Sequence, residues 1–190
     1  MDEIEIENSY GACFIGPPGS GKTSAVGAIS EMCRKLHRTT VIINIDPAND
    51  HLPFEVDFDI LSMITVRDAM KEHNLGPNGA LMFCMDFMAL NIDKVIAALK
   101  PIVQKGSYVL IDAPGQVELF THSESIRTIL NSFKEGLNLS LATVNMVDVG
   151  LAMTKHGFLG QSLMTLATML RLFTPHVSVL SKIDLMETME

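Results

Sequence analysis

The residues from Gly16 to Thr23 have the types and spacing of a phosphate-binding loop. Their order, Gly-Pro-Pro-Gly-Ser-Gly-Lys-Thr, satisfies the pattern G-x-x-x-x-G-K-[ST] in full. Glycines let the backbone turn its N–H groups toward an anion, the lysine reaches terminal phosphates, and the threonine hydroxyl is a natural magnesium ligand. The pattern predicts binding of a nucleoside triphosphate. The alternative is a glycine-rich turn without a ligand.

The flanking sequence supplies the context that this P-loop requires. Residues 10–15 predict a buried strand, and residues 23–36 carry apolar side chains at helical spacing. A helix N-terminus therefore follows the glycines and adds a partial positive charge beneath the anion. The nucleotide contacts are expected from Gly19, Ser20, Gly21, Lys22, Thr23 and Ser24. Lys22 is also a catalytic candidate, because it can reach the β- and γ-phosphates.

A second candidate loop follows the apolar run 107–111. The pentapeptide Asp112-Ala-Pro-Gly-Gln116 fits D-x-x-G-Q. In phosphate-hydrolysing switches the aspartate holds magnesium through a water, Gly115 donates its N–H to the γ-phosphate, and Gln116 orients the attacking water. Phosphoryl transfer depends more on positioning and charge neutralisation than on a strong base, so a neutral glutamine suits it. The alternative is a strand-ending turn that Pro114 and Gly115 merely bend.

Two further loops carry carboxylates. Ser181-Lys-Ile-Asp184 approximates [NT]-K-x-D, a pattern that reads guanine. Asp184 can accept both N1–H and N2–H of guanine, a pair that adenine lacks, and the stem of Lys182 can lie along the base. Ser181 departs from the usual threonine or asparagine, and an ordinary charged loop is the alternative. Asp46, after the β-branched run 39–45, is a third candidate for reaching the magnesium or the attacking water, with a turn-capping role as its alternative.

Apolar strands alternate with helical patterns along the chain, which predicts a single three-layer α/β domain over residues 1–190 with a mainly parallel sheet. Residues 1–9 are expected to be an acidic lead-in. The expected strands are 10–15, 39–45, 107–111, 139–147 and 177–180. The expected helices are 23–36, 65–75 with a Thr65–Asp68 capping box, one containing 81–89, 91–100 capped by Asn91, 118–133 and 161–173. Ligand loops should gather at the carboxyl ends of the strands.

Composition excludes several function classes. A formal net charge of −8 without a basic block argues against direct nucleic-acid binding. No apolar run approaches the roughly 18 residues of a membrane span. Three scattered cysteines and an acidic N-terminus predict buried thiols in a reducing, intracellular compartment. The six histidines lack ligand spacing and are expected at the surface or in loops. Thirteen methionines without a tryptophan fit an adaptable interface or a methionine-filled core.

Taken together, the motifs resemble those of the GPN-loop GTPases. The tripeptide Gly76-Pro-Asn78 lies between the P-loop and the Asp112 loop, and the resemblance extends over almost the whole chain. The strings that carry it also include Asn44-Ile-Asp-Pro-Ala48 and Asp112-Ala-Pro-Gly-Gln-Val-Glu118. Asp46-Pro-Ala-Asn49, Leu52-Pro-Phe-Glu55 and Ser162–Leu170 are most similar to the second of the three eukaryotic paralogues.

The resemblance implies a P-loop NTPase fold of the class that contains the signal-recognition and MinD-like proteins. It implies a homodimer, or a heterodimer with a paralogue, in which the loop Gly76, Pro77 and Asn78 approaches the partner's nucleotide and Asn78 contacts the γ-phosphate region. The residues implied to surround the magnesium and the lytic water are Asp46, Asp112, Gln116 and Glu118. From the residues alone, a helix–helix connector is the favoured interpretation of the tripeptide, and the resemblance reverses that order. Met82, Met85 and Met88 are expected in the dimer contact or in the core.

The same resemblance implies GTP or GDP and Mg²⁺ as ligands. It implies a role in RNA polymerase II assembly and nuclear import, with polymerase subunits or assembly factors as partners and a cytoplasmic location with shuttling to the nucleus. The family continues past the guanine loop with another base-contacting loop and more helices, an extension this chain is expected to lack. Two other functions stay open. One is a nucleotide-gated assembly scaffold with little hydrolysis. The other is a small-molecule kinase, against which we expect Arg67, Arg127 and Arg171 not to cluster.

Overall fold

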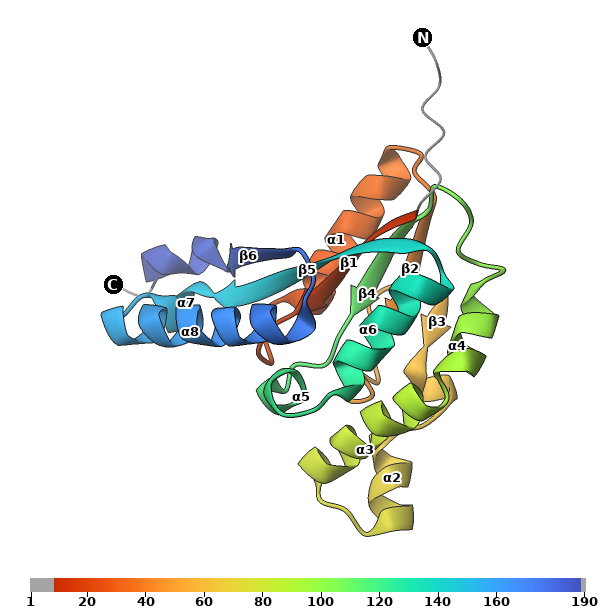
Figure 1. Cartoon of the computed structure of the whole chain (residues 1–190). Coiled ribbons are helices and arrows are strands. Elements are labelled where there is room, and N and C mark those ends of the chain that lie inside the picture. The colour runs from red at the N-terminus through yellow and green to blue at the C-terminus, as the bar shows by residue number, and fades with distance from the viewer. Residues whose placement is uncertain (1–8, 189–190) are drawn as a thin grey trace.

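A six-stranded parallel sheet forms the centre of the computed structural model, which describes residues 9–188 (Figure 1). The strand order is β3-β2-β4-β1-β5-β6. The strands are β1 (Ser9–Ile15), β2 (Thr40–Asn44), β3 (Phe58–Asp59), β4 (Tyr108–Asp112), β5 (Leu139–Asp148) and β6 (His176–Ser181). Because β1 lies between β4 and β5, the P-loop leaves the sheet beside the Asp112 loop. The predicted lead-in falls outside the described residues, except for Ser9.

Helices cover both faces of this sheet, so the predicted three-layer α/β fold is confirmed. The α-helices are α1 (Lys22–Lys35), α2 (Val66–His73), α3 (Pro77–Leu90), α4 (Ile92–Leu99), α5 (Val117–Thr121), α6 (Ser125–Gly136), α7 (Val149–Ala152) and α8 (Lys155–Leu172). Two 3₁₀ turns, η1 (Ile60–Ser62) and η2 (Ile183–Thr188), complete the described elements. None of the helices within residues 9–188 is long and apolar enough to cross a bilayer.

The core lies on both faces of the sheet because strand side chains alternate in direction. Cys13 and Ile15 of β1 belong to a large cluster formed with α3, α4 and α6. Phe14, between them, points to the other face and packs with Val26 of α1. Burying one such large apolar side chain contributes about 1.5–3 kcal/mol. The alternation therefore fixes β1 between two helical layers and so fixes the position of the P-loop that follows it.

The methionine stripe of α3 belongs mainly to this core. Met85 and Met88 are fully buried in the large cluster, and only Met82 is partly exposed. Of the two positions expected for the stripe, the core is therefore confirmed for Met85 and Met88. All three cysteines are buried and unpaired, as predicted. Five histidines are exposed, whereas His176 is half-buried at the start of β6, which contradicts the expectation of a surface or loop position.

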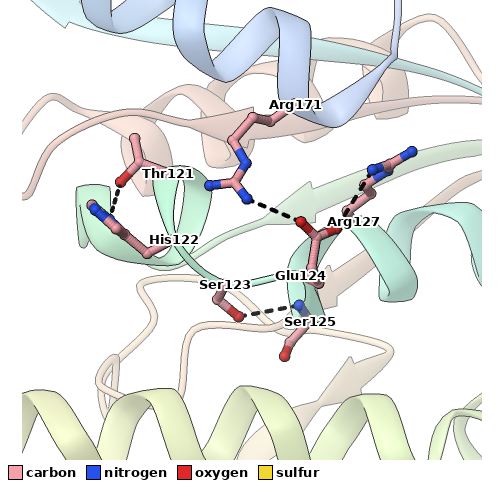
Figure 2. A network of polar contacts seen from close by, with 7 residues as sticks. All are labelled: Thr121, His122, Ser123, Glu124, Ser125, Arg127 and Arg171. Carbon is pink, nitrogen blue, oxygen red and sulfur yellow. Dashed lines mark hydrogen bonds and ion pairs between the residues drawn. The ribbon is translucent and has the colours of Figure 1, made fainter.

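The predicted helix 118–133 is interrupted between α5 and α6, and side-chain hydrogen bonds explain the break (Figure 2). The Thr121 hydroxyl bonds the Val117 carbonyl and the ring of His122, and the Ser123 hydroxyl accepts from the backbone N–H of Ser125. Such local bonds compete with the helical backbone ladder. The result is a turn that directs α5 and α6 differently.

The same junction brings together two arginines, Arg127 and Arg171, that lie 44 residues apart in the chain. Arg171 of α8 lies 2.9 Å from the Glu124 carboxylate, and Arg127 of α6 lies 3.5 Å from it (Figure 2). The expectation that Arg127 and Arg171 stay apart is therefore wrong, because the α5–α6 turn carries Glu124 between their helices. The ion pairs link α8 to the segment that follows the Asp112 loop.

Two helix caps differ in detail from the prediction. The Thr65 hydroxyl accepts from the N–H of Asp68 as expected, but the Asp68 carboxylate accepts from that hydroxyl at 2.6 Å and not from the backbone. The aspartate side chain is shorter than that of glutamate, so it bonds the Thr65 hydroxyl and not the Thr65 backbone N–H. Asn91 stands at the start of α4 without a capping bond, because its amide donates to the Phe87 carbonyl of α3.

Candidate functional site

The P-loop adopts a conformation that only glycine takes without strain at two of its positions. Gly19 and Gly21 have φ angles of 75° and 90°. Helix α1 begins directly after Gly21, and no side chain caps its N-terminus. The first-turn N–H groups therefore face the loop and are available to an anion. Ser20 is fully buried, and its hydroxyl has no hydrogen-bond partner among residues 9–188.

Lys22 places a buried cation over this loop. Its Nζ donates to the carbonyl oxygens of Gly16 at 3.0 Å and Pro17 at 3.2 Å. Burial lowers the pKa of Lys22, while the carboxylates of Asp112 and Asp46 act in the opposite direction and favour its charge. The ammonium is therefore held between the loop carbonyls and two carboxylates from neighbouring strand ends.

Thr23 and Asp112, both predicted magnesium ligands, meet in the structure. The Thr23 hydroxyl donates to Asp112 Oδ2 at 2.6 Å, and the Asn49 amide donates to the same hydroxyl at 3.2 Å. Burial raises the pKa of Asp112 to about 6, against the effect of the bond from Thr23. Its other oxygen, Oδ1, is buried and lacks a hydrogen-bond partner in the described chain. An orphaned carboxylate oxygen beside a hydroxyl is a donor pair that a hard cation would accept.

Asp46 lies in the loop after β2 and caps a turn there. Its Oδ1 accepts from the N–H of Ala48 at 3.0 Å, and its own N–H donates to the side chain of Asn44. Burial raises the pKa of Asp46, while this backbone bond and the charge of Lys22 lower it. The turn-capping alternative is therefore present in the geometry, and the same carboxylate also interacts electrostatically with the P-loop lysine.

The loop after β4 approaches the P-loop closely at Gly115. A Cβ atom there would lie 2.9 Å from the backbone nitrogen of Pro18 and 3.1 Å from Nζ of Lys22. Gln116 is half-buried, and its Oε1 has no partner within residues 9–188. Glu118 is exposed on the first turn of α5. The structure thus brings Gly115 against the P-loop and leaves Glu118 facing solvent.

The predicted base-reading loop leaves the sheet at the end of β6. Ser181 donates its hydroxyl to the Val147 carbonyl at 3.2 Å, which fastens the loop to β5. Lys182 pairs with Asp148 at 2.6 Å, and Asp184 is exposed at the start of η2. The strand order places β5 between this loop and β1, so the base-reading loop and the P-loop lie at one edge of the sheet.

Within residues 9–188, no three His, Cys, Asp or Glu side chains form a metal cluster. That finding is compatible with a magnesium site of this type, because Mg²⁺ keeps several waters and takes one or two protein oxygens together with substrate phosphates. The Thr23 hydroxyl and the orphaned Asp112 oxygen fit such a site.

Comparison with known proteins places this geometry in a family. The family described as "Conserved hypothetical ATP binding protein" matches residues 14–190. The chain is 44% identical to "GPN-loop GTPase QQT1" of Arabidopsis thaliana over 176 residues and 40% identical to "GPN-loop GTPase 2" of Danio rerio over 178 residues. The chain belongs to the GPN-loop GTPase family.

These alignments cover 93% and 94% of this GPN-loop family member but 59% and 56% of the two relatives, so the chain spans less than two thirds of their length. Among solved structures, an apo-form GTPase from Pyrococcus abyssi superposes with a TM-score of 0.82 at 25% identity, over 95% of this chain and 70% of that one. A thymidylate kinase from Ehrlichia chaffeensis reaches a TM-score of 0.51 at 16% identity, covering 92% and 88%, and shares the fold alone.

The tripeptide that gives the GPN-loop family its name lies apart from the P-loop. Gly76 precedes α3, Pro77 is its first residue and Asn78 is exposed on its first turn. Figure 1 shows α2 and the start of α3 projecting away from the sheet, at the bottom of the view. Within residues 9–188, the Lys22 ammonium bonds the carbonyls of Gly16 and Pro17 and the Asp112 carboxylate bonds Thr23, so neither is hydrogen-bonded to Asn78. The helix–helix connector expected as the alternative is the geometry present in one chain.

Three polar residues of the site were not singled out from the sequence. Asn49 bonds the Thr23 hydroxyl, Asn44 holds the Asp46 loop, and Asp148 pairs with Lys182. Asn44 and Asn49 stand two residues before and three residues after the predicted site residue Asp46. Their closeness to Asp46 in the sequence could have identified them as site residues. Asp148 ends a strand as Asp112 does, and that shared position was its signal.

Proposed function

We propose that this chain binds GTP with Mg²⁺ at the P-loop and hydrolyses it to GDP and phosphate. The observation that carries the proposal is the contact between Thr23 and Asp112, which joins the first turn of α1 to the end of β4 beside Lys22. A turn without a ligand has no need of a hydroxyl and a buried carboxylate at that point. Burying the Asp112 charge costs free energy, and a bound cation would offset that cost.

Each residue then has one task. Lys22 turns from the loop carbonyls to the β- and γ-phosphates, and the N–H groups of Gly19, Ser20 and Gly21 with those of α1 hold the phosphate chain. Gly115 donates its N–H to the γ-phosphate, and Gln116 orients the attacking water. Thr23 and, through a water, Asp112 would hold Mg²⁺, which would supply neutralisation of the phosphate charge. Asp46 and Glu118 are proposed to surround the same water.

Lys22→Ala tests the P-loop assignment. Loss of a buried cation that faces a triphosphate should abolish measurable GTP binding by calorimetry, while the melting temperature of the nucleotide-free protein stays within a few degrees. A variant that binds GTP as tightly as the wild type would refute the assignment.

The base preference is the finer part of the proposal. Asp184 and Lys182 support guanine, whereas the matching family description names ATP. Steady-state turnover with GTP and ATP side by side decides between them. Inosine triphosphate adds a control, because it lacks the N2 amino group that Asp184 would accept. We expect turnover in the order GTP, ITP, ATP, and equal or greater turnover with ATP would refute the guanine assignment.

A second subunit completes the site in this proposal. Asn78 is exposed on a projecting helix start, where Pro77 limits the backbone entropy that a contact would cost. It can therefore donate to a phosphate of another molecule and not of its own. Asn78→Ala should leave GTP affinity nearly unchanged and slow hydrolysis, with a dependence on protein concentration in the wild type. Normal hydrolysis by the variant would remove the role in trans.

A scaffold whose bound nucleotide gates assembly is the second candidate, and the surface of α8 favours it. Leu159, Leu163, Leu166 and Leu170 recur at steps of four and three residues, the spacing of a helix–helix seam, and all are exposed. By resemblance, the proposed clients are RNA polymerase II subunits or assembly factors, met in the cytoplasm before nuclear import. Light scattering with GDP and with a non-hydrolysable GTP analogue tests the switch, and identical masses and client binding in both states would refute it.

A small-molecule kinase remains the third candidate. Arg127 and Arg171 are both engaged by Glu124 at the α5–α6 junction. Phosphate released in the absence of any acceptor substrate would favour the GTPase.

A further inference from the structure

The charged pair at the ends of β5 and β6 lies inside the base-reading region, yet only one of its members belongs to the recognised loop pattern. Nζ of Lys182 lies 2.6 Å from Oδ2 of Asp148. The other carboxylate oxygen, Oδ1, accepts from the backbone N–H of Gly150 at 2.8 Å and caps α7. The strand register pairs Asp148 directly with Ser181, one residue before the lysine. Asp148 is thus fixed by the sheet and by α7 before it engages Lys182.

This fixed carboxylate constrains a flexible side chain. Lysine has four rotatable bonds, and ordering it costs rotamer entropy. Lys182 also has a φ of 60°, a left-handed conformation that directs its Cβ differently from its neighbours in β6. The ion pair reduces the number of conformations open to the Lys182 side chain, because the backbone holds its Cβ and Asp148 holds its Nζ. The stem is then in place before a base arrives.

The pair also has an electrostatic consequence for Asp184. That residue lies two positions after Lys182, is exposed, and has no hydrogen bond or ion pair in the described part of the chain. An ammonium released from Asp148 would be free to pair with the Asp184 carboxylate, whose oxygens are needed for the N1–H and N2–H donors of guanine. A buried or half-buried partner holds the lysine better than an exposed one, since solvent screens it less.

We infer that Asp148 is a positioning residue for base selection: it holds the stem of Lys182 across the base site and keeps the ammonium away from Asp184. The inference rests on the proposed guanine binding. Asp148 does not touch the base in this arrangement and acts through Lys182. The ligand class is a guanosine di- or triphosphate, and the prediction concerns discrimination between purines, not phosphate binding, which depends on the P-loop.

The experiment compares GDP and ADP affinities by calorimetry for the wild type, Asp148→Asn, Asp148→Glu and the control Glu31→Gln. Asparagine keeps the oxygen that accepts from Gly150 and removes only the charge, so the α7 cap is preserved. Glu31→Gln removes a comparable ion pair, with Lys35 at 2.9 Å on α1. We expect Asp148→Asn to weaken GDP binding by about tenfold and ADP binding by less than twofold, with partial recovery in Asp148→Glu and no change in the control.

Amine labelling of the nucleotide-free protein gives a second readout. Acetylation of Lys182, quantified by mass spectrometry, should be several-fold faster in Asp148→Asn than in the wild type. A purely structural role would lower GDP and ADP affinities by the same factor, and that result would overturn the inference, as would unchanged labelling of Lys182. A wild type that binds GDP and ADP equally would refute the guanine binding itself and the inference with it. A wild-type preference that survives in Asp148→Asn would refute the inference alone.

Discussion

The buried carboxyl group of Asp112, which we propose serves the magnesium site, acts against the stability of the free protein. Burial raises its pKa from 3.8 to about 6. Between these values the native state binds more protons than the unfolded state, so the free energy of unfolding falls as pH rises from about 4 to about 6, and it stays lower above that. At about 1.4 kcal/mol for each pKa unit, the loss is at most about 3 kcal/mol.

Asp112→Asn removes this cost, so the variant should gain stability relative to the wild type as pH rises from about 4 to about 6. Urea denaturation at several pH values in the absence of nucleotide and magnesium measures that gain. Glu72→Gln, on the exposed surface of α2, is the control and should show no such trend. A stability difference for Asp112→Asn that does not vary with pH would contradict the assignment.

A methyl group added at Gly115 should weaken binding of a GTP analogue more than binding of GDP. A Cβ there would approach the backbone of Pro18 to 2.9 Å, closer than real Cβ contacts come, so the loop must move away from the P-loop. Gly115→Ala should therefore weaken binding of a GTP analogue about tenfold or more, and GDP binding much less, since GDP lacks the γ-phosphate that the Gly115 N–H would reach. Calorimetry with both nucleotides measures the ratio.

Gly160→Ala is the matched control, because nothing lies within 4 Å of the added Cβ and the position is inside α8. It should leave both affinities unchanged and stabilise the protein by up to about 1 kcal/mol. Equal losses of GDP and GTP-analogue affinity in Gly115→Ala would show general damage to the loop instead.

At the scale of elements, the buried side-chain amide of Asn44 is one of the groups that join β2 to the short strand β3. Asn44 is fully buried, donates to Asp59 at 3.0 Å and accepts from the N–H of Asp46 at 3.0 Å. Asn44→Ala would leave a carboxylate and a backbone N–H without these partners, at a cost of about 2–4 kcal/mol. Chemical denaturation should show this loss, and amide exchange at Asp46 should accelerate.

Thr40→Ala, at the half-buried start of the same strand, is the control for Asn44→Ala. Its hydroxyl bonds only the Arg38 carbonyl, so we expect a change below about 0.5 kcal/mol. A loss no larger in Asn44→Ala than in Thr40→Ala would show that the amide does not hold β3 in place.

The sequence predicts an element when the residues that stabilise it lie within the element itself, and fails when they lie elsewhere in the chain. Strands such as β1 and β4 are apolar runs that need no partner to be recognised, and both are predicted within one residue of their observed ends. Strand β3 has only two residues, and it depends on the bonds that Asp57 and Asp59 make to β2. Those bonds join positions 15 residues apart, so no local pattern announces them. The break between α5 and α6 is missed because its apolar positions continue at helical spacing across it.

The candidate site follows the same division. The P-loop and the Asp112 loop are contiguous motifs, and the structure brings Thr23 and Asp112 together as their order predicts. The position of Asp148 beside the base-reading loop follows from the strand register, which pairs it with Ser181. For Asn78 the sequence gives the type of side chain, whereas its place on a projecting helix start comes from the packing of α2 against α3.

Across the whole molecule, apolar side chains are divided unequally between the two ends of the sheet. The strands at the centre are covered on both faces, whereas α8 carries Leu163 and Leu170 with 59% and 57% of their surface exposed. Leu172, at the end of the same helix, is 2% exposed and packs in the large core cluster. The leucines of α8 therefore lie in two environments, and only the buried Leu172 stabilises the fold through burial of its side chain.

Substitutions on the two sides of α8 should separate these environments. Leu172→Ala removes core contacts and should cost about 2–5 kcal/mol in urea denaturation. Leu163→Gln and Leu170→Gln, alone or together, should change the free energy of unfolding by less than about 1 kcal/mol, because glutamine is a good helix former and little apolar burial is lost. The double variant should instead reduce binding of a hydrophobic dye and lower any concentration-dependent mass in light scattering. A loss of stability in the double variant as large as that of Leu172→Ala would mean that the exposed leucines are packed within the folded chain.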